Sequence, residues 1–161
     1  MKLQLIIKEV NKLEIIDQDP TSKDALLLMD ELSNTLEAIT GNSGRHSFNN
    51  DDVCKPRSLF AIAYIQGKAV GCGAIRPIDE NTAEVKRMYA RVKGKGVGGK
   101  ILHYLENKAR KMGYAKLILE TRWINQKAVQ FYEGKSYQRI SNYGKYVDRS
   151  ESACFEKIMN V

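Results

Sequence analysis

The sequence predicts a single α/β (α+β) domain, in which a mixed, mostly antiparallel sheet of six or seven strands is flanked by about four helices. Two observations support this prediction. Three strand-like runs separated only by short turns lie in the middle of the chain, which is typical of an antiparallel meander. A glycine-rich loop, an amphipathic helix and an apolar strand follow, and this order is typical of a β-α-β crossover. The 161 residues suffice for one core, so residues 1–161 are expected to form one domain.

The N-terminal part is expected to contain one strand and one helix. Leu3–Val10 is predicted as the strand. Thr21 is the predicted N-cap of the helix, with Asp24 three residues later. The helix is expected to reach about Thr40, because apolar residues recur at helical spacing. These residues are Ala25, Leu28, Leu32, Leu36 and Ile39. A polar loop with one short helical turn is expected to follow.

The meander is predicted from three runs, Ser58–Gln66, Ala69–Ile78 and Thr82–Ala90. A tight hairpin at Gly67–Lys68 and a longer turn at Asp79–Asn81 separate them. The rest of the chain is predicted to add two helices and three strands. The segments are a helix after the glycine loop that ends at Gly113, a strand at Ala115–Thr121, a helix at Asn125–Lys135, and strands in "YQRISNY" and "SACFEKIM".

The composition indicates a soluble globular protein, with 43% apolar and 28% charged residues. We expect no membrane span, because no apolar run approaches roughly 18 residues, and we expect no signal peptide. Cys54, Cys72 and Cys154 lie far apart, without a C-x-x-C pair or nearby histidines. A reduced, cytoplasmic protein without a metal site is therefore expected.

Positive charge is concentrated in one segment. The net charge is +7, and residues 85–105 contain no acidic residue. The cations of this segment are Lys86, Arg87, Arg91, Lys93, Lys95 and Lys100. A nucleic-acid-binding protein would spread its charge over a face and add stacking aromatics, so we expect no nucleic-acid partner. The charge instead surrounds the glycine loop, which indicates a small anionic ligand.

The stretch "VKGKGVGGKILHYLE" fits three phosphate-binding patterns. The Walker A pattern requires Ser or Thr after Gly-Lys to bind Mg²⁺, and Ile101 stands there, which excludes a triphosphatase. The dinucleotide pattern G-x-G-x-x-G is met by Gly94, Gly96 and Gly99, with an acid at Glu120. The strand ahead of a dinucleotide loop is almost continuously apolar, whereas Thr82–Ala90 carries three charges. A dinucleotide-binding oxidoreductase therefore remains the less favoured alternative.

The third pattern reads Lys93-x-x-Gly96-x-Gly98. Glycines allow successive backbone N–H groups to converge on a pyrophosphate, and the start of the helix offers free N–H groups. A register led by Arg91 also fits the letters. We prefer the Lys93 register, because Val97 then begins the apolar face of the helix. A ligand bound in this way needs no metal ion.

At this point the sequence resembles the GNAT superfamily of acetyl-CoA-dependent N-acetyltransferases. Its signature [Q/R]-x-x-G-x-[G/A] is matched by "KGKGVG", with Lys93 in the leading position. A second signature, N-x-x-A-x-x-[LF]-Y, is matched from Asn125 to Tyr132 in "NQKAVQFY". The resemblance covers about Leu59–Met159, with a CoA-binding core at about 59–140. Further stretches look like a mostly uncharacterised bacterial group of this superfamily.

The resemblance implies an N-acetyltransferase that transfers an acetyl group from acetyl-CoA directly to a primary amine. The acceptor is a small molecule, an amino acid or a peptide. A CoA-binding sensor without turnover remains an alternative, and dimers are common in such proteins, which leaves a homodimer open. The cofactor contacts implied are Met88, Tyr89, Ala90, Lys93, Gly94, Lys95, Gly96, Val97, Gly98, Gly99, Asn125, Ala128 and Tyr132.

The resemblance also implies three roles near the reacting atoms. Tyr132 is the predicted proton donor to the CoA thiolate. Glu84 and Glu120 are the candidates for the general base, and for each of them a structural ion pair is the competing interpretation. Arg76 and Arg87 are candidates for binding a substrate carboxylate, with internal ion pairs as the alternative.

Overall fold

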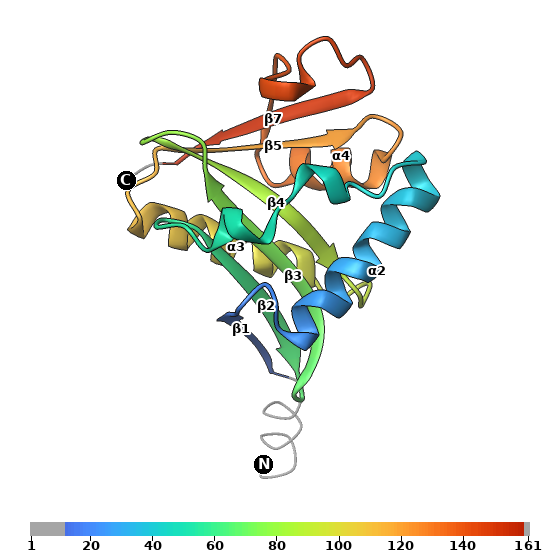
Figure 1. Ribbon diagram of the computed structural model, residues 1–161, viewed down its shortest axis with the longest axis vertical. Coiled ribbons are helices and arrows are strands. Elements are labelled where there is room, and N and C mark those ends of the chain that lie inside the picture. Colours follow the sequence, from blue (N-terminus) through green and yellow to red (C-terminus); the bar gives the residue numbers. More distant parts are fainter. Residues whose placement is uncertain (1–11, 160–161) are drawn as a thin grey trace.

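The computed structural model describes residues 12–159, which form a mixed α/β fold around one twisted sheet (Figure 1). Within this range seven strands follow the order β1-β2-β3-β4-β5-β7-β6. All neighbours are antiparallel except β4 and β5. The strands are β1 (Leu13–Asp17), β2 (Leu59–Ile65), β3 (Lys68–Pro77), β4 (Thr82–Ala90), β5 (Lys116–Arg122), β6 (Gln138–Ile140) and β7 (Ser152–Ile158). The predicted fold class is confirmed.

Three α-helices and three 3₁₀ turns occur among the described residues. They are α2 (Lys23–Thr40), α3 (Val97–Lys111), α4 (Gln126–Gly134), η1 (Arg45–Ser47), η2 (Asn50–Val53) and η3 (Gly144–Tyr146). The two faces of the sheet are covered by different helices. Buried residues of α2 pack with the even-numbered residues Phe60 and Ile62 of β2, whereas α3 and α4 pack with the odd-numbered residues of the same strand. Figure 1 accordingly shows α2 in front of the sheet and α3 behind it.

The first strand and the start of the first helix differ from the sequence prediction. The predicted strand Leu3–Val10 lies outside the described residues. The observed first strand, β1 at Leu13–Asp17, was not predicted. It pairs with β2 as an edge strand. The N-cap of α2 is Ser22, whose Oγ accepts a hydrogen bond from the Ala25 N–H at 3.2 Å. The predicted cap, Thr21, instead donates its hydroxyl to Asp19.

The meander is confirmed, with one turn displaced by a residue. Ile65 pairs with Lys68, so Gln66–Gly67 is the two-residue turn and Lys68 already belongs to β3. Both turn residues have positive φ, 52° and 72°, as the favoured hairpin turn requires. The prediction placed the turn at Gly67–Lys68 from the Gly-Lys pair, and glutamine is an unusual residue for a left-handed conformation.

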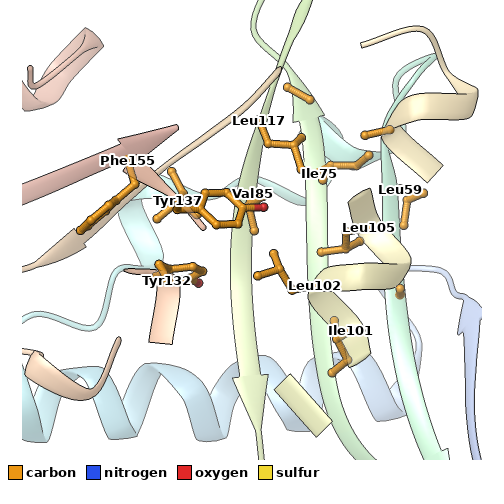
Figure 2. Packing of buried hydrophobic residues seen from close by; sticks show 14 of the residues in the cluster. Leu59, Ile75, Val85, Ile101, Leu102, Leu105, Leu117, Tyr132, Tyr137 and Phe155 are labelled. Carbon is orange, nitrogen blue, oxygen red and sulfur yellow. The ribbon is translucent and has the colours of Figure 1, made fainter. Parts of the chain in front are cut away.

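Two glycines of β3 allow α3 to approach the sheet closely. A Cβ on Gly71 would lie 2.7 Å from the backbone oxygen of Tyr89, and one on Gly73 would lie 2.6 Å from Met88 Sδ. Ile101 of α3 would be within 3 Å of either added atom. Figure 2 shows Ile101, Leu102 and Leu105 of α3 packed against side chains of the sheet.

The parallel strands β4 and β5 are paired over a short length. Their register runs only from Thr82–Lys116 to Glu84–Ile118, and Figure 1 shows the two strands separating beyond it. A β-bulge lies on the other edge of β4, where Arg87 and Met88 both stand opposite Gly73. Arg87 has φ +54°, and bulges increase the local bend of a strand. The bulge and the lost pairing together open the sheet between β4 and β5.

Candidate active site

A cavity of about 540 Å³ occupies the gap between β4 and β5. Its walls are the C-terminal half of α2 with the loop after it, the second half of β4, the end of β5, the start of α4, and η3. Residues separated by more than 100 positions therefore meet around one space. A second hollow of about 480 Å³ adjoins it and shares His46, Ser47 and Lys145.

The glycine loop forms one end of this cavity. Gly94 and Gly96 adopt left-handed conformations, with φ of 73° and 67°, and Gly96 is the N-cap of α3. No side chain caps this helix, so its first N–H groups are available to an anion. Lys93 and Gly98 line the cavity. The other predicted loop contacts lie beside them on the loop and the first turn of α3; these are Gly94, Lys95, Gly96, Val97 and Gly99.

Several cations of the loop have no acidic partner in the part of the chain that the structure describes. Lys93, Lys95 and Lys100 form no ion pair there. Lys135, at the C-cap of α4, is a further cation close to the loop, and sequence reasoning missed it. A Cβ on Gly99 would lie 3.0 Å from its Nζ. The uncapped helix and these ammonium groups favour an anion at the same place.

Helix α4 contributes the predicted tyrosine and asparagine to the opposite wall. Asn125 is the N-cap of α4, with Oδ1 accepting from the Ala128 N–H at 3.4 Å, and both residues line the cavity. Tyr132 also lines the cavity and is 8% exposed. Its ring packs against Phe131, Tyr137 and Phe155, and Figure 2 shows Tyr132 in this cluster. Desolvation raises the pKa of Tyr132, so its hydroxyl stays protonated at neutral pH.

The second half of β4 presents main chain to the cavity. Met88, Tyr89 and Ala90 line it, and from Val85 onward β4 has no strand partner on the β5 side within residues 12–159. Backbone N–H and C=O groups without a partner are strong hydrogen-bonding sites. These three residues, which were predicted to contact the cofactor, therefore lie along an open strand edge.

Glu120, at the end of β5, is the one acidic side chain among the described residues that line the cavity. Its side chain is 11% exposed, and Arg122 Nε lies 3.5 Å from Oε1. Oε1 is buried and makes no hydrogen bond within the described range. Burial raises the pKa of Glu120, although Arg122 and Lys86 oppose this. Such a carboxyl group accepts a proton more readily than an exposed one.

Glu84 and Arg76 lie outside this cavity and are joined to each other. Glu84 is 1% exposed, its Oε1 lies 2.7 Å from an Arg76 guanidinium nitrogen, and its Oε2 accepts a hydrogen bond from the Tyr143 hydroxyl. Arg76 also pairs with Asp52 at 2.8 Å. Both side chains are therefore engaged in the internal ion pairs that were the competing interpretation for them.

Arg87 lines the cavity, but its guanidinium is directed to α2. It donates hydrogen bonds to the Met29 carbonyl at 2.9 Å and to Ser33 Oγ at 2.6 Å. These bonds hold the bulge of β4 against α2, which forms another wall of the cavity. The geometry thus gives Arg87 a positioning role, and the substrate contact remains a prediction.

His46 of η1 also lines the cavity. Sequence reasoning missed Lys145, Tyr146 and Arg149, which line it as well. Nothing in their sequence spacing signals this, because they reach the site from the segment that joins β6 to β7. No helix of residues 12–159 is long and apolar enough to cross a membrane. Over the same range no three His, Cys, Asp or Glu side chains are grouped so that they could hold a metal ion.

The site thus combines a split sheet, a glycine-rich helix start at one end of the gap, and a tyrosine and a carboxyl group within the gap. The chain belongs to the acetyltransferase (GNAT) family, whose model matches residues 27–135. The dinucleotide-binding alternative is therefore wrong. The strand ahead of the glycines pairs antiparallel with β3 and only briefly with β5, unlike the central parallel strand of such a fold.

Individual relatives support this assignment. The chain is 28% identical over 146 residues to an IAA acetyltransferase of Azospirillum brasilense, covering 89% of this chain and 95% of that protein. It is 24% identical to the uncharacterized N-acetyltransferase YsnE of Bacillus subtilis, covering 86% and 95%. A solved Klebsiella pneumoniae protein, provisionally classed as an acyl-CoA N-acyltransferase, matches with a TM-score of 0.76 and 28% identity over 91% and 97% of the chains.

The fold alone is shared with a further structure. The PaiA N-acetyltransferase of Thermoplasma acidophilum, solved in complex with coenzyme A, matches with a TM-score of 0.73 and 17% identity over 92% and 99% of the chains. The family match and the relatives above show that the protein is an acyltransferase of the N-acetyltransferase class.

Proposed function

We propose that this protein transfers the acetyl group of acetyl-CoA directly to a primary amine of a small molecule, amino acid or peptide. The observation that carries the proposal is the Tyr132 hydroxyl in the cavity. It is protonated and makes no hydrogen bond to another residue between 12 and 159. Because Tyr132 lines the cavity, its hydroxyl is available to a ligand that fills this space.

Coenzyme A would extend from the glycine loop along β4. Its pyrophosphate would accept hydrogen bonds from the first N–H groups of α3, with Lys93 and Lys95 supplying positive charge. Its pantetheine arm would pair with the open edge of β4 at Met88, Tyr89 and Ala90. The thioester would then lie between β4 and the start of α4. Shape supports this path, because the cavity runs from Lys93 to Asn125 and beyond.

The reaction needs a neutral amine, a stabilised oxyanion and a protonated leaving group. An alkylammonium with a pKa of about 10.4 is only roughly one part in a thousand neutral near pH 7.4. We propose Glu120, directly or through water, as the base that removes the proton. Glu84 is a weaker candidate, since Arg76 and Tyr143 already bind its carboxylate.

The nitrogen lone pair attacks the thioester carbonyl carbon, and the C=O π electrons move onto oxygen. A backbone N–H of β4 is proposed to stabilise this oxyanion. When the carbonyl re-forms, the C–S bond breaks and the electron pair leaves with sulfur. Tyr132 is proposed to give its proton to that thiolate, so the products are the amide and free CoA.

The experiment that tests the proposal has two parts. Thermal unfolding is first followed with acetyl-CoA and with NAD, since a ligand at 100 times its Kd stabilises by about 2.7 kcal/mol. Release of free CoA is then measured with the thiol reagent DTNB across a panel of amines. Stabilisation by acetyl-CoA and amine-dependent CoA release are expected. Stabilisation without release from any amine would instead favour a CoA-binding sensor.

A further inference from the structure

The end of the cavity away from the glycine loop is strongly positive. Seven of the described residues that line the cavity are Lys or Arg, against the single acid Glu120. Lys93 lies on the glycine loop, and Lys127 lies at the start of α4. The other five surround the space that the amine acceptor would occupy. They are Lys86, Arg87, Arg122, Lys145 and Arg149.

Three of these five cations already have partners. Arg87 is bound to α2 through Met29 and Ser33. Arg122 lies 3.5 Å from Glu120 and 3.2 Å from Glu151. Lys86 donates to the Tyr146 hydroxyl at 3.2 Å and lies 3.9 Å from Glu84. Arg122 and Lys86 therefore lie near carboxylates, and the Arg87 guanidinium is bound to neutral groups of α2.

Lys145 and Arg149 differ, because neither side chain forms an ion pair or a hydrogen bond with any residue between 12 and 159. Among the described residues, the Lys145 ammonium lies over the ring of Tyr146, 5.5 Å from its centroid. The segment that carries both residues is nevertheless well anchored. Asn142 donates to the carbonyl oxygens of Tyr146 and Arg149, and Tyr143 and Tyr146 contact β4 through Glu84 and Lys86.

We propose that the acetyl acceptor carries an anionic group, a carboxylate or a phosphate, close to its amine, and that Lys145 and Arg149 bind this group. The inference rests on the function proposed above and specifies its substrate class. Lys145, Arg149 and Glu120 line the same cavity. An acceptor with its amine at Glu120 and an anion at Lys145 would therefore lie within this one space, as an amino acid could. Binding of a polycationic acceptor is disfavoured, because the cavity offers it one carboxyl group and several positively charged side chains that repel it.

The test compares paired acceptors that differ only in charge. L-Alanine, β-alanine and L-phenylalanine are each assayed beside their carboxamides, and ethanolamine phosphate beside ethanolamine, with spermidine as a polycation. Rates are followed with DTNB at pH 7.5. The carboxamides hold more neutral amine at this pH, because they lack the negative charge that raises the amine pKa. This bias acts against the expected result, which is a kcat/KM at least about 10-fold higher for the acid or phosphate of a pair.

Substitutions then test the two residues. Lys145→Gln and Arg149→Gln are expected to raise the KM of the anionic acceptor about 10-fold or more and to bring the ratio within the pair close to one. The KM for acetyl-CoA and the thermal unfolding temperature should stay unchanged. Lys111→Gln is the matched control, because Lys111 is an exposed lysine at the far end of α3 from the glycine loop.

The amino acid pairs and the ethanolamine phosphate pair show whether the bound anion is a carboxylate or a phosphate. Equal rates for charged and neutral members of every pair, with acetyl-CoA still bound and CoA still released, would overturn this inference and leave the proposed function intact. An unchanged ratio in both variants would overturn it as well. Failure of every amine to release CoA would overturn the proposed function itself, and this inference with it.

Discussion

Tyr132 combines two properties at the scale of a single residue that a proton donor needs. Its ring is held by three aromatic neighbours, and burial raises the pKa of its hydroxyl, so the proton is present at every physiological pH. Tyr132→Phe removes only the hydroxyl and should lower kcat roughly 10²-fold while the KM for acetyl-CoA changes little. Steady-state kinetics with saturating acetyl-CoA measure this.

Tyr137→Phe is the control for Tyr132. Tyr137 packs in the same aromatic cluster, but its hydroxyl donates to Glu106 at 3.1 Å. Its loss should lower the unfolding temperature and leave kcat near that of the wild type. A Tyr132→Phe enzyme with unchanged kcat would remove the proton-donor role.

Glu120 predicts how activity depends on pH. As a base it must be ionised, so kcat/KM should fall as the pH drops through its raised pKa. Glu120→Gln should lower the rate and remove the change of slope at that pKa, which leaves only the pH dependence imposed by ionisation of the amine acceptor. Glu133→Gln, an exposed acid on α4, should retain the change of slope. If it persists in Glu120→Gln, another group is the base.

The same pKa shift has a consequence for stability. A carboxyl group with a pKa higher in the folded than in the unfolded state contributes stability below the unfolded pKa, about 4.3. That contribution is lost as the pH rises through the folded pKa. Glu120→Gln should therefore raise the unfolding temperature at pH 8 by more than it does at pH 4, as calorimetry at the two pH values can measure. A rise of equal size at both would contradict the assigned shift.

At the scale of the element, the glycine loop depends on one backbone conformation. Gly96 is the N-cap of α3 with φ +67°, and an L-residue in this region costs about 1–2 kcal/mol. Gly96→Ala should shift the first N–H groups of α3 and raise the KM for acetyl-CoA about 10-fold, as the loss of one charge-assisted hydrogen bond would. Titration with acetyl-CoA and kinetics both report this change.

Gly134→Ala serves as the control for Gly96. Gly134 ends α4 without a positive φ, and a Cβ there would meet no atom within 4 Å. Its replacement should leave the KM unchanged, and the unfolding temperature should stay the same or rise slightly. Similar KM values for the two variants would show that the loop conformation does not control cofactor binding.

Elements were predictable where local sequence decides them. The ends of β4 were predicted without error, because turn residues stand on both sides of it. The pairing of β1 was not predictable, since its charged residues resemble a loop and only the neighbouring β2 makes it a strand. Ser22 rather than Thr21 caps α2 because the Thr21 hydroxyl is already bound to Asp19, a choice between adjacent hydroxyls that spacing cannot make.

At the scale of the whole molecule, the sequence revealed the parts of the site that lie within motifs. The glycine loop and the α4 motif predicted one end of the cavity, since each is continuous in the chain. Arg76 was a candidate for binding a substrate carboxylate, with an internal ion pair as the alternative, and its partners Asp52 and Glu84 come from η2 and β4. Lys145 and Arg149 were missed for the same reason. Which cations are already paired depends on contacts between distant segments, and no sequence spacing encodes them.

The short pairing of β4 with β5 has a consequence for how the empty protein exchanges its amide hydrogens. From Val85 to Ala90 one side of β4 lacks a neighbouring strand within the described residues. Water can therefore reach the backbone groups on this edge. Acetyl-CoA bound between β4 and β5 would form hydrogen bonds with these groups, as a neighbouring strand would. Hydrogen–deuterium exchange in peptides covering Val85–Ala90 should slow on its addition, while exchange in β2, paired on both sides, should not. Equal exchange with and without acetyl-CoA would mean that the cofactor does not bind between β4 and β5.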